Sequence, residues 1–298
     1  MKNKTLIYIT GPTGIGKTKM SIILAKKLKS EIISSDSRQF YKEMTIGTSV
    51  PTISDLKTVK HHFIQHLSVI DDYSIGNYEK DCIKLINEKF KIYDLLIMTG
   101  GSGMYADSVL YGLDKFPKAN KKIRNNLILL FKKNGIEYLK EKLKEKDPVY
   151  FTKIDLNNHQ RIIRALEVCL SSGKPFSSFL QKKKIDRIFN TKILIIEEER
   201  NKLYEKINKR VDLMIKNGLE KEVRFLTKYQ NKNSLQTLGY KEFFDFFNGN
   251  ITKDEAILKI KKNTRNYAKR QITWNKKYNN AIRISSNFSL NKILNLIK

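Results

Sequence analysis

Cysteine, proline and glycine are all scarce in this chain of 298 residues. Its two cysteines, Cys82 and Cys169, lie far apart and form no CxxC motif, so we expect neither a disulfide framework nor a zinc site. Five prolines and 14 glycines are too few for a linker-rich or fibrous protein. No apolar stretch approaches the roughly 20 residues that span a bilayer, and no signal peptide precedes the first predicted strand. We therefore expect a soluble cytoplasmic protein with no membrane partner.

Acidic residues are also few relative to basic ones. The chain has 58 basic and 30 acidic residues, a net charge of +28, while 40% of its residues are hydrophobic, which is ordinary for a globular protein. Such a charge favours a polyanionic partner. However, 47 of the basic residues are lysine and only 11 are arginine, a pattern typical of a nucleotide-composition bias. Charge alone therefore leaves nucleic-acid binding open.

Strand and helix patterns alternate in the first hundred residues and return near residue 192. Short apolar runs predict strands at Thr5–Thr10, Glu31–Ser34, Asp94–Thr99 and Lys192–Ile196. Helical spacing of the apolar residues predicts a helix at Lys17–Leu28. This alternation predicts an α/β fold, a parallel sheet flanked by helices. Between residues 115 and 189 the pattern is helical and basic, which indicates an insertion subdomain on a core of residues 1–114 and 190–298.

A phosphate-binding loop follows the first predicted strand. Its eight residues match GxxxxGK[ST] between a strand and a helix, which makes the fold P-loop NTPase-like: Gly11, Pro12, Thr13, Gly14, Ile15, Gly16, Lys17 and Thr18. Glycines let backbone N–H groups approach phosphate oxygens, and the helix N-terminus adds partial positive charge. Lys17 would neutralise the outer phosphate, and the Thr18 hydroxyl would help to hold Mg²⁺.

The P-loop alone does not identify the reaction. Kinases and NTPases usually carry an Asp at the end of an apolar strand to hold Mg²⁺, but the run Asp94–Thr99 ends in Gly100-Gly101-Ser102. Asp36, after the second predicted strand, is therefore either a metal-associated acid or a base that acts on an acceptor group. Beside it, Ser37, Arg38 and Gln39 provide groups suited to reading a nucleobase.

Several motifs in a fixed order resemble the tRNA dimethylallyltransferase family, also called tRNA isopentenyltransferase. After the P-loop and Asp36 they are GGSGMY (residues 100–105), QRIIRALEV (160–168), RVDLM (210–214), LGYKE (238–242) and TRNYAKRQITW (264–274). Ser102 stands where the family usually has Thr, and Met104 stands where Leu is common. The zinc-finger extension of eukaryotic members is absent. The resemblance spans nearly the whole chain.

This resemblance implies a prenyl transfer to RNA. The family moves the dimethylallyl group of dimethylallyl diphosphate to N6 of the adenosine immediately 3′ of the anticodon, in tRNAs that read codons beginning with U. Asp36 would accept the proton of the exocyclic amine. The P-loop, Lys17 and Mg²⁺ held at Thr18 would stabilise the departing diphosphate. The expected partners are dimethylallyl diphosphate and the anticodon stem-loop of tRNA, and monomeric action is expected.

The target adenine must leave its stack to react, so we expect a pocket for a flipped base. The residues expected to contact tRNA are Asp36, Ser37, Arg38, Gln39, Ser102, Arg124, Gln160, Arg161, Ile162, Ile163, Arg164, Arg265 and Arg270. Six of the eleven arginines fall in this set. The basic insertion is expected to hold the anticodon stem through salt-sensitive lysine contacts. Tyr267, Trp274 and Tyr278 are candidate stacking residues.

Alternatives remain for individual residues and for the whole protein. Arg161 and Arg164 could instead pair with Glu167, Trp274 could belong to the core, and Arg210 could bind the diphosphate or form an ion pair with Asp212 or Glu205. The three histidines at positions 61, 62 and 66 have no metal-site spacing, which favours packing roles. The competing functions are a nucleoside or nucleotide kinase, prenylation of free AMP, and RNA binding without catalysis.

Overall fold

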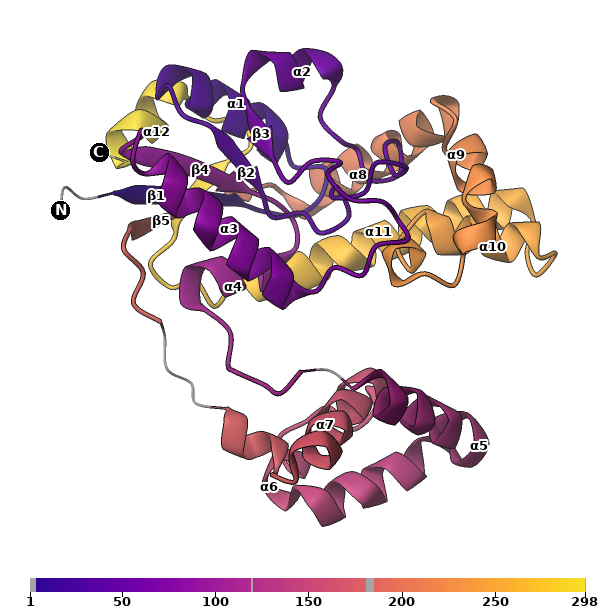
Figure 1. The fold of residues 1–298 in the computed structure, drawn as a ribbon. Helices are drawn as coiled ribbons and strands as arrows, with labels where there is room; N and C mark the ends of the chain where they lie inside the picture. The colour runs from indigo at the N-terminus through magenta and orange to yellow at the C-terminus, as the bar shows by residue number, and fades with distance from the viewer. Residues whose placement is uncertain (1–3, 119, 181–184, 298) are drawn as a thin grey trace. The chain divides into compact units, whose positions relative to one another are not determined.

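The structure is a computed structural model that describes residues 4–118, 120–180 and 185–297. The chain separates into two compact units (Figure 1). The first unit comprises residues 1–111 and 186–298, and the second comprises residues 112–185.

A six-stranded sheet forms the centre of the first unit. Its strands are β1 (Thr5–Thr10), β2 (Ile32–Ser34), β3 (His61–His62), β4 (Leu95–Thr99), β5 (Asn190–Glu197) and β6 (Ile282–Ser285). Their order is β3-β2-β4-β1-β5-β6, and every pairing is parallel. β1 and β4 are continuous apolar runs, as expected for strands that are buried on both faces. In this order, β2, β3 and β4 lie to one side of β1, and β5 and β6 lie to its other side. The carboxyl end of β1 is therefore at the point where doubly wound sheets bind ligands.

Alternate side chains of β1 enter two separate hydrophobic cores. Leu6 and Tyr8 pack with residues of helices α3 and α4, whereas Ile7 and Ile9 pack with residues of α1, α8 and α12. Figure 1 shows these helices around the sheet. This alternation is the period of two that a strand imposes, and it confirms the predicted sheet with helices on its faces.

The helices of the first unit are α1 (Lys17–Lys27), α2 (Ile53–Thr58), α3 (Ile75–Lys89), α4 (Gly103–Tyr111), α8 (Arg200–Lys216), α9 (Leu219–Phe225), α10 (Tyr240–Phe247), α11 (Lys253–Asn275) and α12 (Leu290–Ile297). Two 3₁₀ turns, η2 (Thr227–Tyr229) and η3 (Asn233–Leu235), connect α9 to α10. None of the helices in the described ranges combines the length and the apolarity that crossing a membrane requires.

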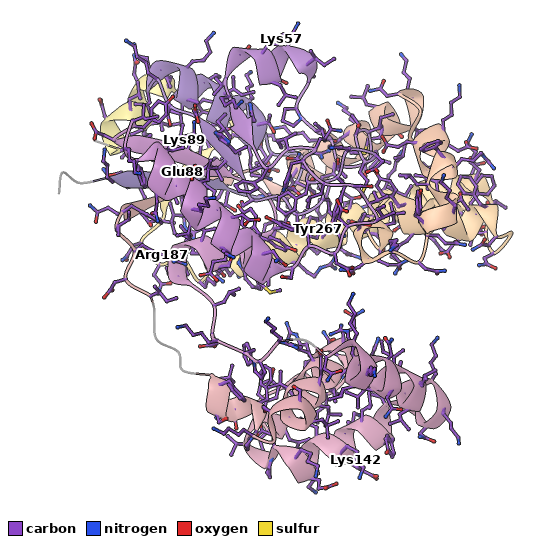
Figure 2. The ribbon with its side chains drawn as sticks, viewed as in Figure 1. Lys57, Glu88, Lys89, Lys142, Arg187 and Tyr267 are labelled. Atoms are coloured by element: carbon purple, nitrogen blue, oxygen red, sulfur yellow. The ribbon has the colours of Figure 1, made fainter. Side chains whose placement is uncertain are left out.

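The second unit is helical. It consists of α5 (Lys121–Lys146), α6 (Pro148–Phe151), α7 (His159–Ser172) and the 3₁₀ turn η1 (Phe176–Phe179). Gly135, with φ of 76°, interrupts α5 and divides it into two helical segments. Leu139, Leu143 and Leu166 lie in a core of this unit's own. On α5, the lysine-rich sequence places side chains such as Lys142 at the surface (Figure 2).

The carboxyl boundary of this unit lies before the predicted one. The expected insertion ended at residue 189, but residues 186–189 belong to the first unit. Arg187 donates hydrogen bonds to the carbonyls of Ser108 and Val109 and to the carboxylate of Glu79 (Figure 2). Phe189 packs against the ring of Phe90, 5.7 Å away between centroids. These contacts attach the segment to α3 and α4.

Candidate active site

The P-loop connects β1 to α1 and forms one wall of a cavity of about 600 Å³. Gly14 and Gly16 have φ of 79° and 101°, which other residues rarely adopt. A Cβ at Gly11 would lie 2.7 Å from the carbonyl oxygen of Ile196, so only glycine fits against β5 there. Residues 13–18 line the cavity, whereas Gly11 and Pro12 do not. Six of the eight predicted P-loop residues therefore line the cavity.

Lys17 is held inside this loop. Its ammonium Nζ donates hydrogen bonds of 2.9 Å to the carbonyls of Gly11 and Pro12. Burial lowers the pKa of Lys17 from its ordinary value to about 8, an effect that the carboxylate of Asp36 opposes and the cation of Arg210 reinforces. Lys17 is therefore a partly buried cation close to a carboxylate, positioned to meet an anion in the cavity.

Asp36 begins the turn that follows β2, at the carboxyl edge of the sheet. One of its carboxylate oxygens, Oδ1, accepts the backbone N–H of Arg38 at 3.2 Å, and its carbonyl accepts the N–H of Gln39 at 3.0 Å. The Asp36 turn is thereby fixed by its own backbone, an arrangement common for Asp in turns. The carboxylate is only partly buried, so it remains accessible from the cavities around it.

The Asp36 turn is joined to the glycine-rich turn that follows β4. The Ser102 hydroxyl accepts the backbone N–H of Ser37 at 3.1 Å, and the two serine hydroxyls lie 3.0 Å apart. A Cβ on Gly100 would lie 2.7 Å from the backbone nitrogen of Asp36, which explains why glycine stands there. The neighbouring strands β2 and β4 thus bring the two predicted site segments into contact, as their parallel pairing requires.

Two cavities meet at Asp36. The P-loop cavity lies on one side of it, and on the other side lies a second cavity of about 580 Å³ with an apolar wall that includes Met104, Val211 and Trp274. Six residues line both cavities: Thr13, Asp36, Gly101, Arg210, Tyr267 and Gln271. One cavity therefore offers cationic and backbone groups for a phosphate, the other offers apolar and aromatic groups, and a carboxylate lies between them.

Arg210, on α8, is a second cation at this junction. Within the described residues its guanidinium has no hydrogen bond or ion pair, although burial lowers the pKa of Arg210 and the charge of Asp36 opposes that shift. The alternative ion pair with Asp212 does not form, because Asp212 pairs with Lys261 at 2.6 Å. Arg210 is partly buried and lines both cavities, so its guanidinium is accessible to a ligand there. The structure therefore favours the reading in which Arg210 meets an anionic ligand.

Helix α11 completes the wall between the cavities. Tyr267, labelled in Figure 2, donates its hydroxyl hydrogen bond to the Gly101 carbonyl at 3.1 Å, and burial together with Asp36 raises the pKa of Tyr267 to about 12. The Gln271 carboxamide donates a hydrogen bond to the Gly101 carbonyl and accepts one from the backbone N–H of Thr13 in the P-loop. The sequence motif that contains Gln271 was noted, but no pattern in the sequence assigned this glutamine to the site, because its partners lie more than 150 residues away.

Comparison with known proteins gives the same result as the motifs. A family model described as IPP transferase matches residues 39–278. This chain belongs to the IPP transferase family. A tRNA dimethylallyltransferase from Christiangramia forsetii is 50% identical over 272 residues, which cover 91% of this chain and 90% of that protein.

Solved structures agree with the predicted fold of this chain. The full-length tRNA isopentenylpyrophosphate transferase from Bacillus halodurans is 34% identical, with a TM-score of 0.72, and the match covers 99% of this chain and 94% of that one. A eukaryotic dimethylallyltransferase acting on tRNA is 26% identical, with a TM-score of 0.82, over 99% of this chain and 78% of that one. The predicted family and the predicted P-loop fold with a parallel sheet are thereby confirmed.

The residues expected to contact tRNA in the first unit have different environments. Ser37, Arg38, Ser102 and Arg270 line the apolar-walled cavity. One guanidinium nitrogen of Arg38 also donates hydrogen bonds to the carbonyls of Asn233 and Ser234, which fixes the side chain beside η3. With Asp36, five of the predicted tRNA-contact residues of the first unit therefore line one cavity.

Gln39 and Arg265 do not share that cavity. Gln39 lines the P-loop cavity, and its amide donates to the carbonyls of Thr48 and Ser49. The Arg265 guanidinium donates to the Asn208 side chain at 2.8 Å and lies 5.9 Å from the ring centroid of Tyr204. Both side chains thus have structural partners of their own.

The residues expected to contact tRNA in the second unit are divided by burial. Ile162 and Ile163 lie in that unit's core, 0% and 3% exposed, which contradicts the expectation that their side chains contact tRNA. They belong to a motif that is continuous in sequence, but a helix with 3.6 residues per turn directs only one of its faces toward the core. Gln160 and Arg161 are exposed on the same helix, α7.

Arg124 and Arg164 share one buried carboxylate. Glu167 is 0% exposed, and its Oε2 accepts from both guanidinium groups at 3.1 Å, while its Oε1 accepts the backbone N–H of Asn120. The alternative pairing with Glu167 is thus observed for Arg164, and it extends to Arg124. Each arginine has five N–H donors, so each retains donors for a phosphate.

The three histidines have partners within the fold, and His61 lies 2.8 Å from the Val59 carbonyl. His62 lies 2.6 Å from the Glu31 carboxylate, which also binds Lys89 at 2.8 Å, and His66 packs its ring on Phe40. No group of three or more potential metal-binding His, Cys, Asp or Glu residues occurs in the described ranges.

Proposed function

We propose that this protein is a tRNA dimethylallyltransferase. It transfers the dimethylallyl group of dimethylallyl diphosphate to N6 of the adenosine immediately 3′ of the anticodon in tRNAs that read codons beginning with U, and it releases diphosphate. The observation that carries the proposal is the junction at Asp36, where a P-loop cavity meets an apolar-walled cavity. This arrangement suits an anionic substrate on the P-loop side and a second substrate that presents an amine to the carboxylate.

The diphosphate belongs on the P-loop side. Lys17, Arg210 and the amides of the loop surround that cavity, and all of them stabilise the negative charge that develops on the departing diphosphate. In the transfer, the bond between the allylic carbon and the diphosphate oxygen breaks, and its electron pair stays with that oxygen. The P–O–P linkage remains intact, which distinguishes this use of the loop from phosphoryl transfer.

The adenine belongs on the other side of Asp36. Its exocyclic nitrogen forms the new N–C bond, and Asp36 accepts the proton that the nitrogen loses. The flipped base would enter the cavity of about 580 Å³, where Ser37, Arg38 and Ser102 present hydrogen-bonding groups and Trp274 presents an aromatic face. A carboxylate fixed by its own turn needs no rearrangement to receive the amine.

Mg²⁺ fits the P-loop cavity. The Thr18 hydroxyl lines it and makes no hydrogen bond within the described residues, and Mg²⁺ takes few protein ligands when phosphate oxygens are present. Thr18 would hold the ion, which would neutralise charge on the diphosphate.

Other surfaces would bind the body of the tRNA. We propose phosphate contacts for Arg270 and Arg265 on α11, and for Gln160 and Arg161 at the surface of the second unit. The lysines of α5 would add sequence-independent affinity that decreases with salt. All the groups needed for the chemistry come from one chain, so we propose a monomer; light scattering during gel filtration would check this.

The test uses purified protein, dimethylallyl diphosphate labelled in its prenyl group, Mg²⁺ and unmodified tRNA. Label should enter a tRNA that reads a codon beginning with U. A matched transcript in which guanosine replaces the adenosine 3′ of the anticodon should remain unlabelled. Label in AMP but not in tRNA would indicate a free-nucleotide prenyltransferase, and ATP-dependent phosphorylation without prenyl transfer would indicate a kinase.

A further inference from the structure

The carboxamide of Gln271 bridges two loops that carry different halves of the site. Its Oε1 accepts the backbone N–H of Thr13 in the P-loop at 2.8 Å, and its Nε2 donates to the carbonyl of Gly101 at 2.9 Å. The side chain comes from α11, 258 residues from Thr13 and 170 residues from Gly101. The residue is only 7% exposed, so these hydrogen bonds are largely shielded from competing water.

Each loop leads directly to one side of the reaction. Thr13 lies four residues before Lys17, in the loop proposed to hold the diphosphate. Gly101 precedes Ser102, whose hydroxyl accepts the N–H of Ser37 next to Asp36. Hydrogen bonds therefore connect the P-loop through Gln271 to Gly101, and the adjacent Ser102 continues the connection to the turn of the proposed base.

The packing around Gln271 leaves little freedom. A Cβ on Gly101 would lie 2.5 Å from Nε2 of Gln271 and 3.5 Å from Oδ2 of Asp36. The absence of a side chain at Gly101 thus lets the Gln271 amide and the Asp36 carboxylate both lie close to its backbone. Tyr267 donates to the same Gly101 carbonyl at 3.1 Å and occupies its second lone pair.

An amide suits the two partners of Gln271. Thr13 offers only a donor and Gly101 only an acceptor, and a carboxamide satisfies both with one planar group. A glutamate would accept from Thr13 but could not donate to Gly101 when ionised. It would also place an anion in the wall of the proposed diphosphate cavity, which Gln271 lines. A lysine could donate to Gly101 but could not accept from Thr13.

We propose that Gln271 is a positioning residue that sets the separation between the diphosphate-binding loop and the Asp36 turn. It acts through Thr13 and Gly101, and the proposal rests on the proposed function. Each substrate has its own binding groups, so loss of the bridge should leave the two separate affinities nearly unchanged. The chemical step should slow, because the allylic carbon and the amine no longer meet in the required geometry. Misplacement by about 1 Å is enough to cost roughly 10²-fold in rate.

The experiment compares two variants with the wild type in single-turnover transfer of labelled prenyl group to tRNA. Gln271→Met keeps the shape and removes both hydrogen bonds, whereas Gln271→Glu keeps the bond to Thr13. We expect the Gln271→Met rate to fall roughly 10²-fold. The dissociation constants for tRNA, by filter binding, and for inorganic diphosphate, by calorimetry, should stay within about threefold of wild type. Gln271→Glu should lower the rate and also weaken diphosphate binding.

Asn263→Ala is the matched control. Asn263 is an amide on the same helix, and it donates to Glu242 at 2.7 Å, away from both loops. Its loss should lower the melting temperature about as much as Gln271→Met does, without changing the single-turnover rate of the folded enzyme. A purely structural role for Gln271 predicts that the two variants behave alike.

Other outcomes would overturn the proposal. A Gln271→Met rate within about threefold of wild type would do so, as would equal losses of rate and of both affinities. If Gln271→Met does not fold, Gln271→Glu decides: a wild-type rate overturns the bridge, and a reduced rate with unchanged tRNA binding supports it. Failure of the proposed function would be seen separately, as absence of prenyl transfer by the wild-type protein.

Discussion

Replacing Asp36 by asparagine tests the proposed chemistry most directly. Asparagine keeps the oxygen that accepts the Arg38 N–H at 3.2 Å, so the turn should survive. It removes the negative charge and the proton acceptor. Loss of a general base typically costs about 10²- to 10⁴-fold in rate. That factor corresponds to about 3 to 5 kcal/mol of activation free energy.

The same substitution should change the pH dependence of the reaction. The pKa of Lys17 is about 8 in the free protein, and the charge of Asp36 is what opposes a further decrease. Lys17 is charged below its pKa and neutral above it. In the wild type, kcat/KM for dimethylallyl diphosphate should therefore decline as the pH rises through about 8. In Asp36→Asn the pKa of Lys17 is lower, so the decline should begin at a lower pH.

The assay measures initial rates of label transfer to tRNA at a series of pH values, with tRNA affinity measured separately. Asp245→Asn, an exposed position on α10, is the matched control and should behave like the wild type. Equal losses of tRNA binding and turnover in Asp36→Asn would make Asp36 a structural residue. An alkaline decline at the same pH in both proteins would refute the electrostatic coupling between Asp36 and Lys17.

Three further substitutions test other parts of the site. Arg210→Met should raise KM for dimethylallyl diphosphate roughly 10- to 100-fold, because it removes a charged hydrogen-bond donor, and steady-state kinetics would measure this. Gly103→Ala would place a Cβ 2.2 Å from Nε1 of Trp274, so unfolding in urea, followed by the fluorescence of this single tryptophan, should show a loss of about 1–3 kcal/mol. Glu222→Gln should lower the free energy of unfolding by roughly 2–4 kcal/mol, because the Glu222 carboxylate accepts three backbone N–H groups of residues 45–47 and the Tyr240 hydroxyl; denaturation measured with the same probe would check it.

Controls distinguish these effects from general damage. Arg224→Met removes an exposed arginine that pairs with Glu220, and it should leave KM unchanged. Gly76→Ala adds a methyl group whose nearest neighbour would be 3.8 Å away, so it should not destabilise the protein. An unchanged KM in Arg210→Met, or wild-type stability in Gly103→Ala or Glu222→Gln, would contradict the corresponding contact.

The central strands could be predicted because their signals are local. Thr5–Thr10 and Asp94–Thr99 are apolar runs that end in glycine, and the structure has strands at Thr5–Thr10 and Leu95–Thr99. β3 and β6 were not predicted, because they are two and four residues long and include His61, His62 and Arg283. At the edges of a sheet, pairing with a neighbouring strand determines the structure more than local composition does.

The site was predictable where its residues belong to motifs and less so where it depends on distant partners. The P-loop, Asp36 and Ser102 were identified from short patterns, and strand pairing brings them together. Whether Arg210 had a partner could not be read from the sequence, because Lys261 takes the nearby Asp212 through a contact between two helices. Similarly, a continuous motif could not separate the inward-facing Ile162 from its exposed neighbour Arg161.

The position of α11 in the chain has a consequence for synthesis. The P-loop and the Asp36 turn lie within the first 40 residues of the sequence, but Gln271 follows the Asp36 turn by more than 230 residues. A nascent chain therefore displays an anion-binding loop long before the wall that joins it to the Asp36 turn has left the ribosome. Premature termination before α11 would release a fragment that still has its nucleotide-type motif but lacks an assembled site.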